Sequence, residues 1–417
     1  MRKISKISLV AAVAVAGFST ANAQPLEEAI KNVDVSGSVV YGYDNFNNSE
    51  AASGGITSGK NNYKIGLNLS SKVNDYVKFN SRFIVGGKDS GWAGLNAKQG
   101  EDSDQNVDVT LSNAYFGFTA IPNTVVNIGK MGLATPYTVA VDINGNEQTG
   151  TGILALTTVG PVTAGAGYIN QTNLDKITDV NLTGNKYSKI VKNSDLNAGT
   201  HSLDGASDLY VATLQGDLDF VKLESWYLGM QDTFNSYTLA ATSSIDLAEN
   251  AKIGLEARYV NLKLDSDVVT GDDRKNSMFR FAVDGKFSIV NARLAYTKTG
   301  KDGGLTAVDQ DAKNTSLGWG ITSNGIADAD YFQAALGADI LDNLNFTAHY
   351  GNLKSKDNFA VAGGTGDYKA QEVYGQLTYK MSKNLTTYLR YGNFEQKEAS
   401  DKVRDENRGR IQVAYTF

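Results

Sequence analysis

The last eight residues of the chain, 410–417, alternate between large apolar side chains and polar or small ones. Successive side chains of a β-strand point to opposite faces, so this segment predicts a strand with one apolar face. A strand of this kind that ends on an aromatic residue is typical of the closing strand of an outer-membrane β-barrel, which lies between lipid and water. A soluble β-sandwich that ends in a strand is the alternative. The apolar face carries Ile411, Val413, Tyr415 and Phe417.

The other end of the chain has the three parts of an export signal. Basic residues among the first six precede an apolar run over residues 7–18, and an Ala-Asn-Ala motif ends at Ala23. A membrane helix needs roughly 20 apolar residues, which disfavours the alternative of an N-terminal membrane anchor. We expect residues 1–23 to be a cleaved signal peptide and residues 24–32 to form an N-terminal strap.

Composition fits an exported barrel and excludes several other classes. The 417 residues include only 4 Pro and no Cys, which excludes disulfides, Cys-based metal sites and Cys nucleophiles. The formal net charge is −6, and loss of Arg2, Lys3 and Lys6 with the signal peptide takes it to −9. A nucleic-acid-binding surface is basic, so a nucleic-acid partner is not expected.

Amphipathic segments of about ten residues recur from residue 33 to the end of the chain. Phe279, Phe281 and Val283, for example, alternate with Arg280 and Asp284. The apolar phase often ends in Tyr or Phe, whose rings suit the boundary between lipid and water. We therefore predict an all-β fold, a transmembrane antiparallel β-barrel of about 18 strands that occupies residues 33–417 as one domain.

The connections between these segments alternate in length. Short turns such as Gly160-Pro161 contain Pro, Asn, Asp or Gly, whereas residues 88–106, 171–205 and 301–328 are long, polar segments. Short periplasmic turns and long external loops are the layout of a bacterial outer-membrane barrel. We expect the long segments to be external loops.

Two stretches resemble a known family. Residues 25–37 look very like the mature N-terminus of the Campylobacter-type major outer membrane porins, and the signal peptide is similar too. Residues 113–118 and 124–130 resemble a strand pair found widely in porins, in which the second strand leads into a loop that folds into the pore. The resemblance implies a homotrimeric, 18-stranded, water-filled channel with a tendency to cation selectivity, in a family for which calcium is reported.

The residues also support a pore directly, because 16–18 strands leave an aqueous lumen whereas about eight are filled by side chains. Residues 132–150 follow the porin-like strand pair and carry Asp142 and Glu147. If this loop folds inward, these acids face wall arginines across a constriction, where such charges set ion preference. The alternative is an external loop, with the arginines paired to acids of neighbouring strands. The predicted constriction comprises Asp142, Glu147, Arg82, Arg258, Arg280 and Arg293.

Divalent cations such as calcium prefer several carboxylate and amide oxygens. The same loop offers Asp142, Asn146 and Glu147, so these are the candidate calcium ligands, although no cofactor is required for diffusion.

We therefore expect an outer-membrane porin for passive diffusion of ions and small hydrophilic solutes, with modest cation selectivity and no enzymatic activity. A barrel that acts mainly as an adhesin or structural protein is one alternative, and a barrel hydrolase is another, since Ser, Asp and Glu are plentiful. The expected partners are outer-membrane lipid, further copies of the chain in a homotrimer, and the outer-membrane assembly machinery, which would recognise Phe417.

Overall fold

The computed structural model describes residues 32–50, 56–94, 107–142, 147–178, 190–191, 201–269, 271–361, 364–399 and 401–417. The expected signal peptide and all but the last residue of the expected strap lie outside these residues. No helix in the described ranges is long and apolar enough to cross a bilayer.

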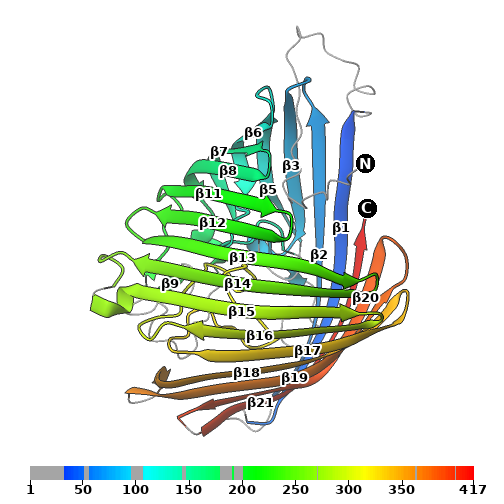
Figure 1. Ribbon diagram of the computed structural model, residues 1–417, viewed down its shortest axis with the longest axis vertical. Coiled ribbons are helices and arrows are strands. Elements are labelled where there is room, and N and C mark those ends of the chain that lie inside the picture. The colour runs from blue at the N-terminus through cyan, green and yellow to red at the C-terminus, as the bar shows by residue number, and fades with distance from the viewer. Residues whose placement is uncertain are drawn as a thin grey trace.

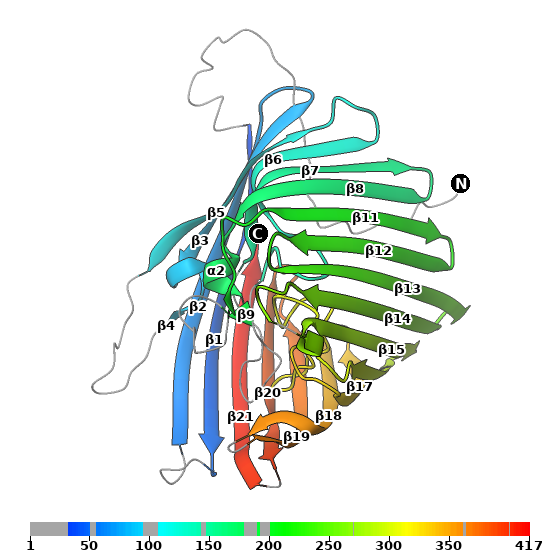
Figure 2. The ribbon, with the colours of Figure 1, turned by 90° about the vertical axis from the view of Figure 1, so that its left-hand side faces the viewer.

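The chain forms one large antiparallel sheet that closes on itself (Figures 1 and 2). The sheet has 19 strands, of which β4 has two residues, so 18 strands make the barrel wall. The predicted all-β barrel and its strand number are confirmed. The strands are β1 (Val33–Asn48), β2 (Ile56–Lys72), β3 (Val77–Gly86), β4 (Ala93–Gly94), β5 (Asp108–Phe118), β6 (Thr124–Gly132), β7 (Thr149–Val159), β8 (Val162–Thr172), β11 (Leu209–Leu218), β12 (Val221–Met230), β13 (Phe234–Ala248), β14 (Ala251–Leu264), β15 (Lys275–Phe287), β16 (Val290–Thr299), β17 (Asp330–Leu341), β18 (Leu344–Val361), β19 (Gly364–Lys380), β20 (Leu385–Glu398) and β21 (Asp401–Thr416).

Small elements lie in the connections. They are the helices η1 (Lys88–Ser90), α2 (Leu174–Ile177) and η3 (Gly271–Arg274), and a parallel pair of two-residue strands, β9 (Ile190–Val191) and β10 (His201–Ser202).

The barrel closes by pairing its first strand with its last, β1 with β21. The seam continues beyond β21, since the Gly37 amide donates to the Phe417 carbonyl at 2.9 Å and the Phe417 amide donates to the Gly37 carbonyl at 3.1 Å. The Phe417 ring covers Gly37, where a Cβ atom would come within 2.8 Å of Cζ of that ring. Gly37 therefore makes room for the aromatic side chain that completes the seam.

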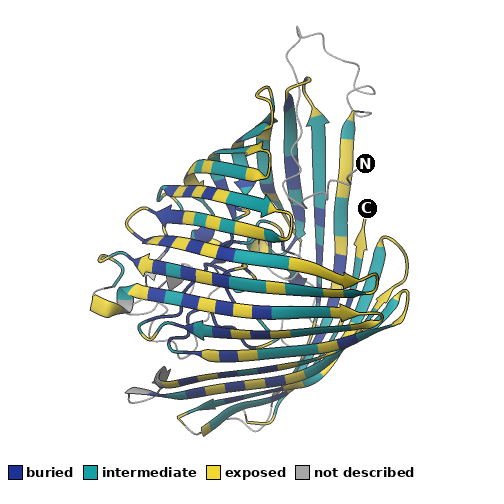
Figure 3. Ribbon diagram, viewed as in Figure 1, coloured by how far each residue is buried: buried dark blue, intermediate teal, exposed yellow. Residues whose placement is uncertain are grey.

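The two faces of the wall alternate along strands such as β13 and β15, as bands of buried and exposed residues show (Figure 3). On β13, Phe234 and Thr238 point inward and are buried, whereas Tyr237 and Leu239 point outward and are exposed by 47% and 53%. An apolar outer face of this kind suits lipid, and a polar inner face suits water. The alternation read from the sequence is thus confirmed.

The short connections are tight turns in which residues such as Asn123 (φ 57°) and Gly160 (φ 58°) take left-handed backbone conformations. Asn and Gly tolerate that conformation better than other residues, so these turns follow local sequence preferences. The three prolines in the described part, Pro122, Pro136 and Pro161, all lie outside the strands, as the paired wall requires.

Candidate functional site

Two of the long connections narrow the space inside the barrel. The first inward loop comprises residues 133–148, between β6 and β7, of which residues 143–146 lie outside the described part. The second inward loop comprises residues 301–328, between β16 and β17. The second loop was expected to be external, and its observed position inside the wall corrects that expectation.

The first inward loop closes on itself at its base. The Leu133 amide donates to the Gln148 carbonyl at 2.9 Å, and the Gln148 amide donates to the Val139 carbonyl at 2.8 Å. The Val139 amide in turn donates to Oε1 of Gln148 at 3.0 Å. Because these backbone groups are paired with one another, the base of the loop can be buried without leaving them unpaired.

A buried ion pair anchors this loop to the wall. Nε and Nη2 of Arg82 on β3 donate to the two carboxylate oxygens of Glu147 at 2.9 and 2.6 Å. Ser112 of β5 donates to the same carboxylate at 2.8 Å, and Asn68 accepts from the Arg82 guanidinium at 2.8 Å. The Glu147 side chain is fully buried, and such bidentate, charge-assisted contacts fix the position of both partners.

A second wall cation holds the loop a few residues earlier. Nζ of Lys64 on β2 donates to the backbone carbonyl of Asp142 at 2.7 Å and lies 3.8 Å from a carboxylate oxygen of Glu147. These charged groups are buried and therefore poorly solvated, so each needs a partner of opposite charge nearby. The carboxylate of Glu147 on the loop is that partner for Lys64 and Arg82 on the wall. The wall beneath the first inward loop is thus basic, and the loop supplies the compensating acid.

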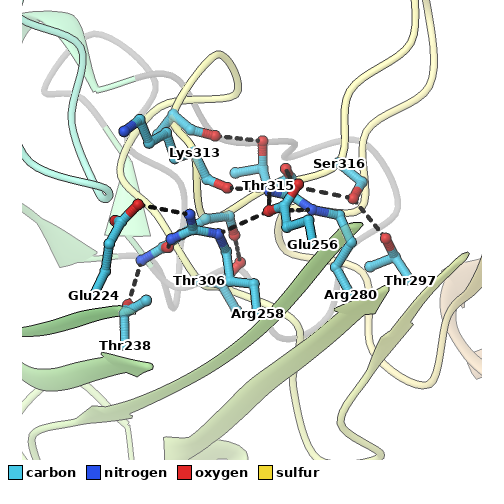
Figure 4. Close-up of polar contacts among 12 residues, drawn as sticks. Glu224, Thr238, Glu256, Arg258, Arg280, Thr297, Thr306, Lys313, Thr315 and Ser316 are labelled. Carbon is cyan, nitrogen blue, oxygen red and sulfur yellow. Dashed lines mark hydrogen bonds and ion pairs between the residues drawn. The ribbon is translucent and has the colours of Figure 1, made fainter. Parts of the chain in front are cut away.

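The second inward loop is held by arginines on the opposite wall (Figure 4). Arg280 of β15 donates to the backbone carbonyls of Lys313, at 2.9 Å, and of Thr315. Arg258 of β14 donates to the side-chain oxygen of Asn314 at 3.2 Å. Guanidinium groups, which carry five donors in a fixed plane, are well suited to binding several loop oxygens at once.

Glu256 is the shared anionic partner of these arginines. Its carboxylate lies 2.6 Å from Nη2 of Arg280, 3.2 Å from Nε of Arg258 and 3.5 Å from Nη2 of Arg293. Arg293 also pairs with Asp284 at 2.6 Å. The three cations therefore lie close together because one central carboxylate offsets their mutual repulsion.

The far end of the second loop is anchored by a carboxylate instead. Glu372 of β19 is buried, and its two oxygens accept from the backbone amides of Trp319 at 2.9 Å and Gly320 at 2.7 Å. Apolar packing supports this end, since the loop shares one buried cluster with the inner faces of the neighbouring strands. The cluster comprises Ile321, Ile326, Ala329, Tyr331, Leu353, Tyr368, Ala370 and Phe394.

The two loops meet inside the barrel. The amides of Val308 and Asn314 donate to the carbonyls of Tyr137 and Pro136 at 3.0 and 2.9 Å, and Nε2 of Gln148 donates to the Val308 carbonyl at 3.0 Å. Tyr137 is fully buried at this junction, and burial raises the pKa of its hydroxyl to about 12. The hydroxyl therefore stays protonated over the physiological pH range.

The structure brings some predicted site residues together and separates others. Arg82 pairs directly with Glu147 of the first inward loop and does not face it across an opening. The ion pairs of Arg258, Arg280 and Arg293 in the described part run to the strand acids Glu224, Glu256 and Asp284. The role of Glu256 and Glu372 was not anticipated. Only the contacts reveal that Glu256 joins three arginines.

The candidate calcium site stays a prediction. Asn146 lies outside the described residues, and both carboxylate oxygens of Glu147 already accept from Arg82. A cation at Glu147 would have to displace that guanidinium, so the donor set as folded does not suit a divalent ion. Within the described ranges, no cluster of three or more His, Asp or Glu residues is placed to bind a metal.

Comparison with known proteins decides the family. A family model described as "Campylobacter major outer membrane protein" matches residues 1–417. The chain belongs to this family. It is an outer-membrane porin, and its barrel forms a channel across the outer membrane. The resemblance noted from the sequence is thereby confirmed.

Solved structures of other porins have the same fold. OpdQ of Pseudomonas aeruginosa is 16% identical, with a TM-score of 0.69 over 94% of this chain and 99% of that one. OccAB3 of Acinetobacter baumannii is 14% identical, with a TM-score of 0.69 over 92% and 99%. OccK2 (OpdF) of Pseudomonas aeruginosa, solved in complex with glucuronate, is 13% identical, with a TM-score of 0.69 over 92% and 98%. Among curated proteins, no sequence matches the chain.

Proposed function

We propose that this porin is a passive diffusion channel for ions and small hydrophilic solutes, whose narrowest part is bordered by the two inward loops. The observation that carries the proposal is the fixation of both loops to opposite walls. Arg82 holds the first loop through Glu147, and Arg280 holds the second through the backbone carbonyls of Lys313 and Thr315. An 18-stranded wall encloses more space than side chains alone fill, and the loops reduce that space to a size that selects solutes.

We further propose modest cation selectivity. The wall arginines named above are compensated by Glu147, Glu256, Glu224 and Asp284, so they add little net positive charge to the lumen. The acidic excess of the chain, with a formal charge of −6 that becomes −9 on loss of the expected signal peptide, then favours cations near the mouth. Salt screens this field over about 10 Å at 0.1 M, so selectivity is expected to weaken as the salt concentration rises.

The reversal potential in a planar bilayer under a salt gradient tests the selectivity. Changing Asp142→Asn together with Glu147→Gln is expected to shift it towards anions, because Arg82 and Lys64 then lose their compensating charges. Asp75→Asn, in an exposed turn, is the matched control and should leave the potential unchanged. An unchanged potential in the inserted double variant would show that the first inward loop does not border the ion path.

We propose that Phe417 is the contact for the outer-membrane assembly machinery, because it completes the seam with Gly37. Phe417→Lys is expected to lower the amount of folded protein in the outer membrane several-fold. Phe287→Lys is the control, since Phe287 is a similarly exposed aromatic residue at a strand end away from the seam. Equal surface levels of the two variants, measured by heat-dependent mobility on gels, would contradict this role.

The remaining proposals follow from the family resemblance. We propose a homotrimer, which crosslinking of the detergent-solubilised protein tests.

We also propose that the channel has no catalytic activity. Of the two histidines, His349 lies on a strand, where its ring stacks on the ring of Tyr374 with the centroids 4.4 Å apart. Assays of lipid and peptide hydrolysis by the purified protein test the second proposal.

A further inference from the structure

A small hollow lies in the inner wall on both sides of the barrel seam. Its volume is about 210 Å³, and it lies where β21, β1 and β2 run side by side. A short segment after η1 contributes to its border. The lining residues are Gly42, Asp44, Lys60, Asn62, Trp92, Arg410 and Gln412.

The hollow exists because Gly42 stands in the middle of a row of larger residues. Gly42 pairs with Asn62 of β2 on one side and with Gln412 of β21 on the other. A Cβ atom at Gly42 would have no heavy atom nearer than the Ile411 carbonyl oxygen, at 3.9 Å. The missing side chain therefore leaves open space between two amide groups that point to the same face of the sheet.

One of these amides has an unused hydrogen-bonding group. Asn62 is only 8% exposed, and its Oδ1 atom has no hydrogen-bond partner in the described part of the chain. A buried polar atom without a partner costs roughly 1–3 kcal/mol, so such atoms mark places where water or a ligand binds. The opposite amide, Gln412, is held in place because its Oε1 accepts from the Tyr388 hydroxyl at 3.0 Å.

The other lining groups define the kind of ligand. The Asp44 carboxylate is already paired with Arg410, at 2.5 and 3.2 Å, so neither charge is available for a bare ion. Trp92 contributes an aromatic ring, brought to this place because β4 pairs with β2 at Asn62 and Tyr63. The hollow thus combines an apolar aromatic surface with amides and with a neutralised ion pair.

We propose that this hollow is a binding subsite for a ring of monosaccharide size that carries several hydroxyl groups. The C–H face of such a ring suits the electron-rich face of an indole. Hydroxyl groups donate to amide oxygens and carboxylates and accept from amide NH2 groups. The ligand hydroxyls would supply the hydrogen bond that Asn62 lacks. The inference rests on the proposed channel function, since the hollow is reached from the lumen.

The first experiment measures ion current through the full-length protein in a planar bilayer with increasing D-glucose. The current is expected to fall to a plateau as glucose is added, and to fall further than the conductivity of the solution does. Reversible binding should also add fluctuations to the current. D-mannitol, which has similar hydroxyl groups but no ring, should lower the current only through bulk conductivity. A wild-type channel that conducts but responds equally to both solutes overturns the subsite and leaves the channel function standing.

Variants test the location. Gly42→Leu fills the hollow and should abolish the saturable effect, whereas Trp92→Ala should raise the half-saturating glucose concentration about tenfold. The matched control is Gly216→Leu, because Gly216 lies on the outward face of β11 and its Cβ position is equally open, with Leu218 at 3.9 Å. If Gly42→Leu behaves like Gly216→Leu, the subsite is not in this hollow.

A second measurement is independent of conductance. Glucose is expected to change the tryptophan fluorescence of the detergent-solubilised wild-type protein, and the change should persist in Gly216→Leu and disappear in Gly42→Leu. A wild-type protein without any glucose-dependent change overturns the subsite even if no channel activity is found. If glucose changes the fluorescence but the inserted protein conducts no current, the proposed channel function is contradicted and the subsite is not.

Discussion

Replacing residues 304–327 by a short Gly-Ser linker is expected to raise the single-channel conductance by roughly twofold or more, because the wall alone encloses an aqueous lumen. The replacement removes the loop that is buried inside the barrel, including Leu305, Val308 and Ile326. The ends that remain are close together, since the Asp328 amide donates to the Gly300 carbonyl at 2.7 Å. The measurement is conductance of inserted channels in a planar bilayer.

Lys313→Ala is the control for this deletion, because the Lys313 side chain is exposed while its backbone carbonyl is held by Arg280. It should leave the conductance close to that of the wild-type protein. A deletion variant that inserts and conducts like the wild type would show that the second inward loop does not border the ion path, and would contradict the proposed constriction.

Breaking the buried pair of Arg82 and Glu147 is expected to release the first inward loop. Glu147→Leu leaves the Arg82 guanidinium buried without its carboxylate, and such a loss costs about 3–5 kcal/mol. Hydrogen exchange at the amides of Leu133 and Gln148, which close the base of the loop, should therefore accelerate by roughly a hundredfold or more. The change is measurable by mass spectrometry of the detergent-solubilised protein.

The double variant Arg82→Met/Glu147→Leu should recover much of the protection, because replacing both partners removes the unpaired charge. Asp75→Leu is the exposed control, since its pair with Lys72 at 2.7 Å is solvated at both ends and such surface pairs contribute little to stability. If exchange at Leu133 and Gln148 is the same in Glu147→Leu as in Asp75→Leu, the ion pair does not hold the loop.

The barrel was predictable because it is determined by short-range features of the sequence, the alternation of side chains within strands and the residues of the turns. Alternation on segments such as Phe279–Val283 follows from lipid on one side and water on the other, and turn residues such as Asn123 and Gly160 favour the bends between strands. Counting these segments gave about 18 strands, and the N-terminal resemblance to known porins implies the same number. These signals do not depend on which distant residues come into contact.

The arrangement of the constriction was not predictable in the same way. The second inward loop has the polar composition of an external loop, and its burial depends on partners far along the chain, such as Glu372 for the Trp319 amide. Arg82 and Glu147 are 65 positions apart, and many other arginine and acid pairs were equally compatible with the pattern. The sequence offered one weak hint, the apolar residues Leu305, Val308, Ile321 and Ile326 in an otherwise polar loop.

The contact between the two inward loops has a consequence for how the pore can change over time. Val308 and Asn314 bind Tyr137 and Pro136 through backbone amides and carbonyls, which every residue except proline can supply in full. Exposed side chains of the two loops can then be exchanged without altering the outline of the opening. Mutation can thus retune which ions and solutes pass while the aperture keeps its dimensions, so permeability and architecture can evolve separately.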